Sequence, residues 1–151
     1  MDSVQGEEGR GLRRVFVEPF TNDTSEAKLE TIFRKAFIDQ FVRIAGYRLV
    51  ENRRRADVIL SGHIVGFSAA PLSYREDKLA AEERLTVTVE IIFQSGDSQQ
   101  VLWSDRKFSG SEVYLLKGTD PLLVRELRSQ ALEKIASDIA ERAYQRMVSG
   151  F

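Results

Sequence analysis

His63 is the only histidine of the chain and the first candidate for acid–base or metal chemistry. It stands between Gly62 and Ile64 in an apolar stretch, with no sequence neighbour that forms a catalytic triad or a zinc site. Asp57 and Asp105 would have to meet His63 in space to complete a site, and the chain has no cysteine to help them. We therefore predict a structural histidine, with no catalytic residue, no metal site and no cofactor.

Two further segments resemble catalytic motifs only superficially. Gly9-Arg10-Gly11 precedes a predicted strand, whereas a dinucleotide-binding glycine loop follows one. Ser109-Gly110-Ser111 lacks the G-x-S-x-G frame of a hydrolase nucleophile and is predicted to end a strand. The charge runs Glu82-Glu83 and Arg53–Arg55 are predicted to be solvated turns or strand edges. The residues therefore predict a protein that is not an enzyme.

One kind of chemistry remains, which is the binding of an amphipathic anion. Tyr74, Arg75 and Lys78 lie in one predicted connection, and Lys117 lies in the predicted loop 114–118 before the last helix. Each loop combines apolar or aromatic groups with a cation, which suits a phosphate that carries acyl chains. On spacing alone, two ordinary surface loops are the favoured interpretation.

Composition bounds the remaining classes of function. The 151 residues fit one domain with a substantial core. The chain has 22 basic and 23 acidic residues and a net charge of −1, so no global field attracts nucleic acid or an anionic membrane. Any anion contact must come from a local patch. The absence of cysteine excludes disulfides but leaves the cellular compartment open.

The first elements that must position these residues are a strand and a helix. Val15 and Val17 alternate with their neighbours in a short strand from Leu12, which Pro19 ends. A helix is predicted to begin at 23–25, with a capping box between Asp23 and Glu26, and to end at Gly46. Its apolar stripe comprises Leu29, Ile32, Phe33, Ala36, Phe37, Phe41 and Ile44.

The middle of the chain predicts strands. An extended piece at 47–50 and a charged turn at 52–55 precede a long strand at 57–67, which is apolar on both faces and therefore central. Its Gly62 and Gly66 indicate a bend, a bulge or a close backbone approach. The segment 69–80 is predicted to be a connection.

The last part of the chain has the clearest pattern. A strand with an apolar face is followed by a hairpin turn at Gly96-Asp97, a strand at 99–109, and a helix that Asp120-Pro121 opens. The strand's apolar face comprises Leu85, Val87, Val89, Ile91 and Phe93. The helix stripe comprises Leu127, Ala131, Ile135, Ile139, Ala143 and Met147. The whole predicts an α+β two-layer sandwich of order β-α-β-β-β-α, with two helices on one face of a mixed four-stranded or five-stranded sheet.

The sequence also resembles a known family in several short motifs. These are Val-Glu-Pro-Phe-Thr-Asn-Asp-Thr-Ser-Glu at 17–26, Ala-Asp-Val-Ile-Leu-Ser-Gly at 56–62, Leu-Thr-Val-Thr-Val at 85–89, Val-Leu-Trp at 101–103 and Phe-Ser-Gly-Ser-Glu-Val-Tyr at 108–114. In their order and spacing they resemble the lipopolysaccharide-assembly lipoprotein family LptE. That family's fold, two helices on a mainly four-stranded sheet, agrees with the predicted layout.

The resemblance implies a function that the residues alone do not. Members of the family are non-enzymatic outer-membrane lipoproteins on the periplasmic face, which plug the lumen of the LptD β-barrel and help deliver lipopolysaccharide to the outer leaflet. Their basic lipopolysaccharide-contacting positions fall here on Arg75 and Lys117, with Lys78 and Tyr74 beside them. The resemblance further implies a signal peptide and an N-terminal lipidated cysteine. Neither is present in this sequence, so we expect residues 1–11 to be a disordered or cloning-derived lead-in and 12–151 to be a single domain.

A second class of function remains open from the sequence. A periplasmic adaptor or secretion-pore subunit of similar α+β layout would bind protein along a sheet edge. Such a protein would need no lipid-binding end.

Overall fold

A single mixed sheet forms one layer of the protein. The computed structural model describes residues 13–44, 46–74, 76, 80–116 and 120–149. Along the sheet the strand order is β3 (Tyr47–Leu49), β1 (Arg13–Val17), β4 (Val58–Tyr74), β5 (Ala80–Ser95) and β6 (Val101–Leu115). A sixth, short strand, β2 (Thr21–Asn22), also pairs with β4. The path therefore has five strands, at the upper end of the predicted number, and β2 adds a strand that the sequence pattern did not indicate.

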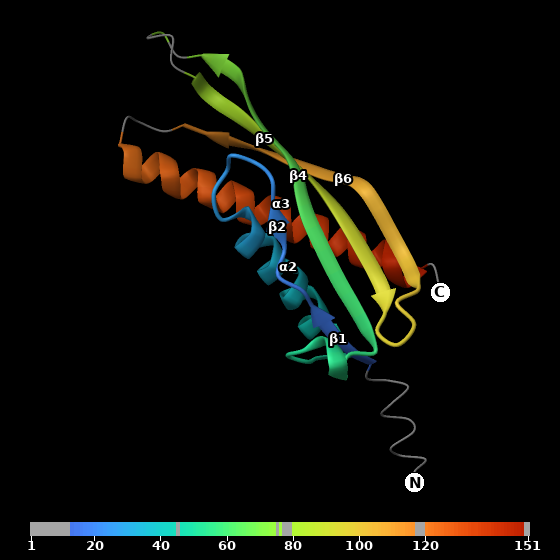
Figure 1. Ribbon diagram of the computed structural model, residues 1–151. Helices are drawn as coiled ribbons and strands as arrows, with labels where there is room; N and C mark the ends of the chain where they lie inside the picture. The colour runs from blue at the N-terminus through green and yellow to red at the C-terminus, as the bar shows by residue number, and fades with distance from the viewer. Residues whose placement is uncertain (1–12, 45, 75, 77–79, 117–119, 150–151) are drawn as a thin grey trace.

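The direction of pairing changes at β4. Strands β1 and β2 pair with β4 in parallel, β1 also pairs in parallel with β3, and β4, β5 and β6 are antiparallel neighbours. Strand β4 therefore lies between the two halves of the sheet, as its two-sided apolar pattern predicted. The long strands β4, β5 and β6 continue past the parallel half and form one end of the molecule (Figure 1).

Strand β4 has a free edge over its second half. Its last backbone partners on the side away from β5 are β2 and the Asp23 amide, which donates to the Ile64 carbonyl over 3.0 Å. From 65 to 74 no backbone hydrogen bond joins that side to any described residue. We call residues 66–74 the free edge of β4.

Both helices cover the same face of the sheet (Figure 1). Helix α2 (Leu29–Arg43) and helix α3 (Pro121–Ser149) pack against each other, and α3 also packs along β6 and β5. The predicted apolar faces meet in this interface. The described core includes Phe33, Phe37 and Phe41 of α2, the five alternating residues of β5, and Ala131, Ile135, Ile139, Ala143 and Met147 of α3. The predicted α+β two-layer sandwich is thus confirmed.

The start of α2 differs from the predicted capping box. The helix begins at Leu29, preceded by Lys28 in a left-handed conformation with φ of 71° and no side-chain cap. Residues 22–26 instead form a turn in which Asn22 Nδ2 donates to the Glu26 carbonyl, and Asn22 Oδ1 accepts from the Thr24 amide. These local side-chain bonds compete with helix formation and delay it. At the other end the helix stops at Arg43, before Gly46, whose φ is 114°.

The long strands are longer than predicted. The segment 69–74, predicted as part of a connection, continues β4, and β6 extends to Leu115 through the Ser-Gly-Ser segment expected to end it. Pro71 indicated a connection rather than a strand. It fits in β4 because a proline, which has no amide hydrogen, is tolerated on a free edge.

The two glycines of β4 have the roles that the sequence predicted. A Cβ atom at Gly62 would overlap the ring of Phe20, so this position requires a close approach. Gly66 follows a register shift after Ile64, which is a bulge. The bulge turns Val65 toward solvent and lets Phe67 pack against the core.

Candidate functional site

Exposed apolar side chains gather where β4 and β6 end and α3 begins. Of the ten large hydrophobic residues that are exposed in the described structure, six lie there. We call this group the sheet tip, and it comprises Leu72, Tyr74, Val113, Leu115, Leu122 and Leu123. Tyr74 and Leu122 are the most exposed of them, at 66% and 70%. Such a concentration of apolar surface at one end of a domain marks a site of interaction.

Strand pairing brings the two sequence-predicted loops to this end. Tyr74 is paired with Ala80, Leu115 is paired with Glu82, and the Leu116 amide donates to the Ala81 carbonyl over 2.9 Å. The residues that flank the two loops therefore stand at the ends of adjacent strands. Arg75, Lys78 and Lys117 themselves lie outside the described residues, and only Tyr74 of the four predicted site residues is described.

A polar network under the tip joins four elements through one guanidinium. Arg128 of α3 donates from Nη2 to Glu26 Oε1 over 2.8 Å and from Nε to Glu26 Oε2 over 3.2 Å. Its Nη1 lies 3.6 Å from Glu83 Oε1 of β5, and its guanidinium carbon lies 5.3 Å from the ring centre of Phe67 of β4. Arg128 thereby ties the start of α3 to the turn before α2 and to the sheet.

Tyr114 of β6 completes this network. Its hydroxyl donates to Glu83 Oε1 over 2.7 Å. Burial, and then the hydrogen bond to the Glu83 carboxylate, raise the pKa of Tyr114 to about 12. The Glu82-Glu83 run is therefore not simply solvated as predicted, since Glu83 is paired beneath the surface and Glu82 accepts from the Ser73 hydroxyl. The sequence carries no signal for this network, because its members are separated by as many as 102 positions.

His63 does not form the site considered from the sequence. Its Nε2 lies 2.6 Å from Oδ2 of Asp23, a residue whose position predicted a helix cap. Asp57 is instead bound to the Arg14 side chain, and Asp105 accepts from the Lys107 amide. The hydrogen bond and charge of Arg14 hold the pKa of Asp57 below its usual value. Among the described residues, no group of three or more histidine or acidic side chains is placed to hold a metal ion.

A groove of about 420 Å³ runs between α2 and α3 on the helical face. Its lining alternates opposite charges, with Lys35 and Arg43 beside Asp39 and Glu133. Lys35 Nζ and Asp39 Oδ2 are already paired over 3.0 Å. The groove therefore presents no cluster of one charge and no uniform apolar wall for a ligand.

No helix among the described residues has both the length and the apolar character needed to cross a membrane.

Comparison with known proteins assigns the family. Residues 12–147 match the sequence model of LptE, described as lipopolysaccharide-assembly. The chain belongs to the LptE family. This match spans nearly the whole described fold, and it confirms the resemblance drawn from the sequence motifs. The LptE-family chain is thus a lipopolysaccharide-assembly protein of outer-membrane biogenesis.

Solved structures agree on the fold. The rare lipoprotein B from Shewanella oneidensis is 14% identical with a TM-score of 0.55, over 90% of this chain and 94% of that chain. The protein CT253 from Chlamydia trachomatis is 8% identical with a TM-score of 0.61, over 91% and 99%. A minor lipoprotein from Acinetobacter baumannii is 12% identical with a TM-score of 0.51, over 91% of each chain. No curated protein sequence matches the chain.

Proposed function

We propose that this LptE-family protein binds lipopolysaccharide at the sheet tip and acts, without catalysis, as the plug of the LptD β-barrel at the periplasmic face of the outer membrane. The observation that carries the proposal is the gathering of exposed apolar residues beside the attachment points of the two cationic loops. Arg75, Lys78 and Lys117 would bind the lipid's phosphates, and Tyr74 with the leucines of the tip would contact its acyl chains.

The rest of the surface supports a plug. The chain has 30% charged residues and a net charge of −1, which suits the polar lumen of an outer-membrane barrel. The network around Arg128 supports the same proposal, because it fixes the tip against α3 and so presents a preorganised binding end.

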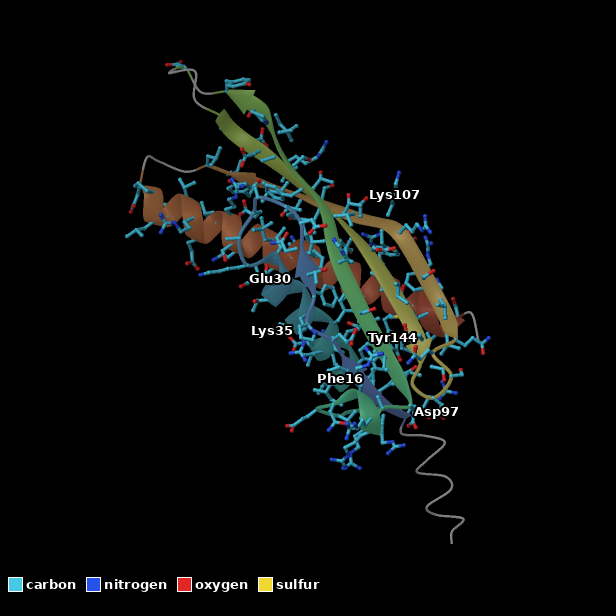
Figure 2. The ribbon with its side chains drawn as sticks, viewed as in Figure 1. Phe16, Glu30, Lys35, Asp97, Lys107 and Tyr144 are labelled. Atoms are coloured by element: carbon cyan, nitrogen blue, oxygen red, sulfur yellow. The ribbon has the colours of Figure 1, made fainter. Side chains whose placement is uncertain are left out.

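Lipopolysaccharide binding is tested by reversing charge in the two loops. The double variant Arg75→Glu/Lys117→Glu should bind lipopolysaccharide at least about tenfold more weakly at low salt, since each charge-assisted bond contributes roughly 1.5–3 kcal/mol. The matched control Lys35→Glu/Lys107→Glu makes the same change in net charge on α2 and on the bend of β6 (Figure 2). Equal affinities for the two double variants would remove the tip as the binding site.

The plug role needs a separate experiment. Co-expression with the LptD of the same organism should give a complex that survives purification in detergent. Failure of the two proteins to copurify would count against the plug while leaving lipid binding to be judged on its own assay.

The free edge of β4 favours a second candidate, an adaptor that binds a protein partner by strand addition. Residues 66–74 carry unpaired backbone groups on one side and no charged side chain, and an exposed edge of this kind is a template for another strand. Such an adaptor would form a large assembly in light scattering and show no affinity for lipopolysaccharide. A monomer that binds lipopolysaccharide excludes it.

A further inference from the structure

Six arginines gather at the end of the molecule opposite to the sheet tip. They lie at the start of β1, on β3 and on the short helix η1 (Arg53–Arg55), and all are exposed. We call this group the arginine base, and it comprises Arg13, Arg14, Arg48, Arg53, Arg54 and Arg55. Figure 2 shows the nitrogen atoms collected at this end, below the labelled Phe16 and close to Asp97.

The register of the sheet forces two of these charges together. Arg14 of β1 and Arg48 of β3 are direct partners in the parallel pair, so both side chains emerge on the same face of the sheet. Like charges at such positions repel each other. The repulsion between these two guanidinium groups is reduced where a negative group binds one of them.

The described residues supply fewer negative groups than the base has arginines. Arg14 Nη2 pairs with Asp57 Oδ1 over 3.0 Å, and Arg53 pairs with Glu18. The other four arginines, Arg13, Arg48, Arg54 and Arg55, form no ion pair with any described residue. Within the part of the chain that the structure describes, Glu51 and Asp97 are the remaining carboxylates near the base. Counted over the described residues, this end therefore carries an excess of positive charge, although the net charge of the chain is −1.

The arginines of η1 are held on a packed support. Val50, Ala56 and Ile59 form a second small core with Phe16, which fixes the η1 segment against the face of the sheet that the helices leave open. The Asn52 side chain accepts from the Arg55 amide over 3.2 Å and caps the turn. The guanidinium groups thus extend from an ordered surface rather than from a free loop, which reduces the entropy lost when they bind.

We propose that the arginine base docks on a membrane surface of anionic phospholipid. Guanidinium groups match phosphate in charge and in hydrogen-bond geometry. A membrane is favoured over nucleic acid because the aromatic residues of β1 and β3, Phe16 and Tyr47, are half-buried, so these strands offer no fully exposed ring for base stacking. The choice of a lipid surface also rests on the proposed function, which places the protein beside a membrane.

The separation of the two ends gives the docking a role. Strand β4 has 17 residues from Val58 near the base to Tyr74 at the tip, which spans roughly 50 Å at about 3.3 Å per residue. Docking by the base therefore leaves the tip clear of the phospholipid headgroups. The same molecule can hold a membrane at one end and a lipopolysaccharide at the other.

The experiment measures cosedimentation with vesicles of phosphatidylcholine, with or without phosphatidylglycerol. The protein should bind only the anionic vesicles, and binding should weaken as salt is raised. An arginine near an anionic surface contributes about 1 kcal/mol, which is roughly fivefold in affinity. The triple variant Arg48→Gln/Arg54→Gln/Arg55→Gln should therefore bind roughly a hundredfold more weakly.

A matched variant distinguishes the effect of the arginine base from the effect of the net charge of the protein. Lys35→Gln/Lys107→Gln/Lys134→Gln removes three positive charges away from the base and should lose far less affinity. Circular dichroism confirms that each variant is folded, and Arg54→Gln alone, with an expected fivefold loss, replaces the triple variant if that one unfolds. Equal losses in the two triple variants, or no binding of the unaltered protein to anionic vesicles, would overturn the inference.

The test also distinguishes this inference from the proposed function. Binding to lipopolysaccharide micelles but not to phosphatidylglycerol vesicles overturns the docking surface and leaves the lipopolysaccharide proposal in place. Binding to the vesicles without any affinity for lipopolysaccharide supports the arginine base and counts against the tip.

Discussion

Replacing Arg128 with methionine tests whether the network under the tip holds the two layers together. Methionine keeps most of the length of the side chain and removes its charge and its hydrogen bonds. The change leaves the carboxylates of Glu26 and Glu83 without their cation. Their side chains are only 22% and 17% exposed. An unpaired charge in such a position is costly because water reaches it poorly.

The size of the effect follows from the burial of the pair. Exposed ion pairs contribute about 0–1 kcal/mol, and breaking a fully buried pair costs about 3–5 kcal/mol. The Arg128 side chain is 30% exposed, so Arg128→Met should cost roughly 2–3 kcal/mol. For a domain of this size that corresponds to a melting temperature lower by about 4 to 12 °C.

The assay is urea and thermal unfolding followed by circular dichroism. The control is Lys35→Met, which breaks an ion pair with Asp39 whose side chains are 77% and 52% exposed, and which should change stability by about 0.5 kcal/mol or less. Adding Glu26→Gln and Glu83→Gln to Arg128→Met should restore part of the loss, because the stranded charges are then absent. Equal stability of Arg128→Met and Lys35→Met would refute the reasoning from burial.

Three other predictions concern single positions. Gly62→Ala should destabilise the fold by about 1–3 kcal/mol in urea unfolding because the new methyl group overlaps Phe20, and adding Phe20→Leu should restore most of the loss. Folding raises the pKa of Tyr114 from 10.0 to about 12, so the contribution of its hydroxyl to stability is complete below pH 10 and is lost as the pH rises through 12. Tyr114→Phe should therefore lower the free energy of unfolding by about 1 kcal/mol below pH 10 and flatten the decline of stability at alkaline pH. Because Arg14 lowers the pKa of Asp57 below 3.8, the contribution of this carboxylate is complete above that pH and is lost as the pH falls below it. Asp57→Asn should therefore flatten the acid limb of the stability profile, and an unchanged limb would contradict this assignment.

Predictions of structure from the sequence were most reliable where local pattern and burial act together. The alternating face of β5 is fully buried, and Asp120 accepts from the Leu122 amide at the start of α3 as its position before Pro121 predicted. Both features depend on residues a few positions apart. They are therefore visible in the order of residue types alone.

Predictions failed where distant residues decide the local structure. Glu26 looked like part of a helix cap, but its carboxylate is bound by Arg128, which lies 102 positions away. The end of β4 looked like a loop, and it is extended because β5 pairs with it. For the candidate site, the sequence identified two cationic loops but left open whether they meet, and it could not indicate the paired network beneath the strand ends that flank them.

The free edge of β4 has a consequence for which strands can join it. Pro71 lies in the middle of this edge and offers no amide hydrogen, so an incoming strand finds one position where its carbonyl has no donor. The pairing of any incoming strand is therefore interrupted near Pro71. The edge would accept short segments on either side of that position more readily than one long continuous strand. This limits the growth of assemblies in which molecules pair edge to edge in concentrated solution.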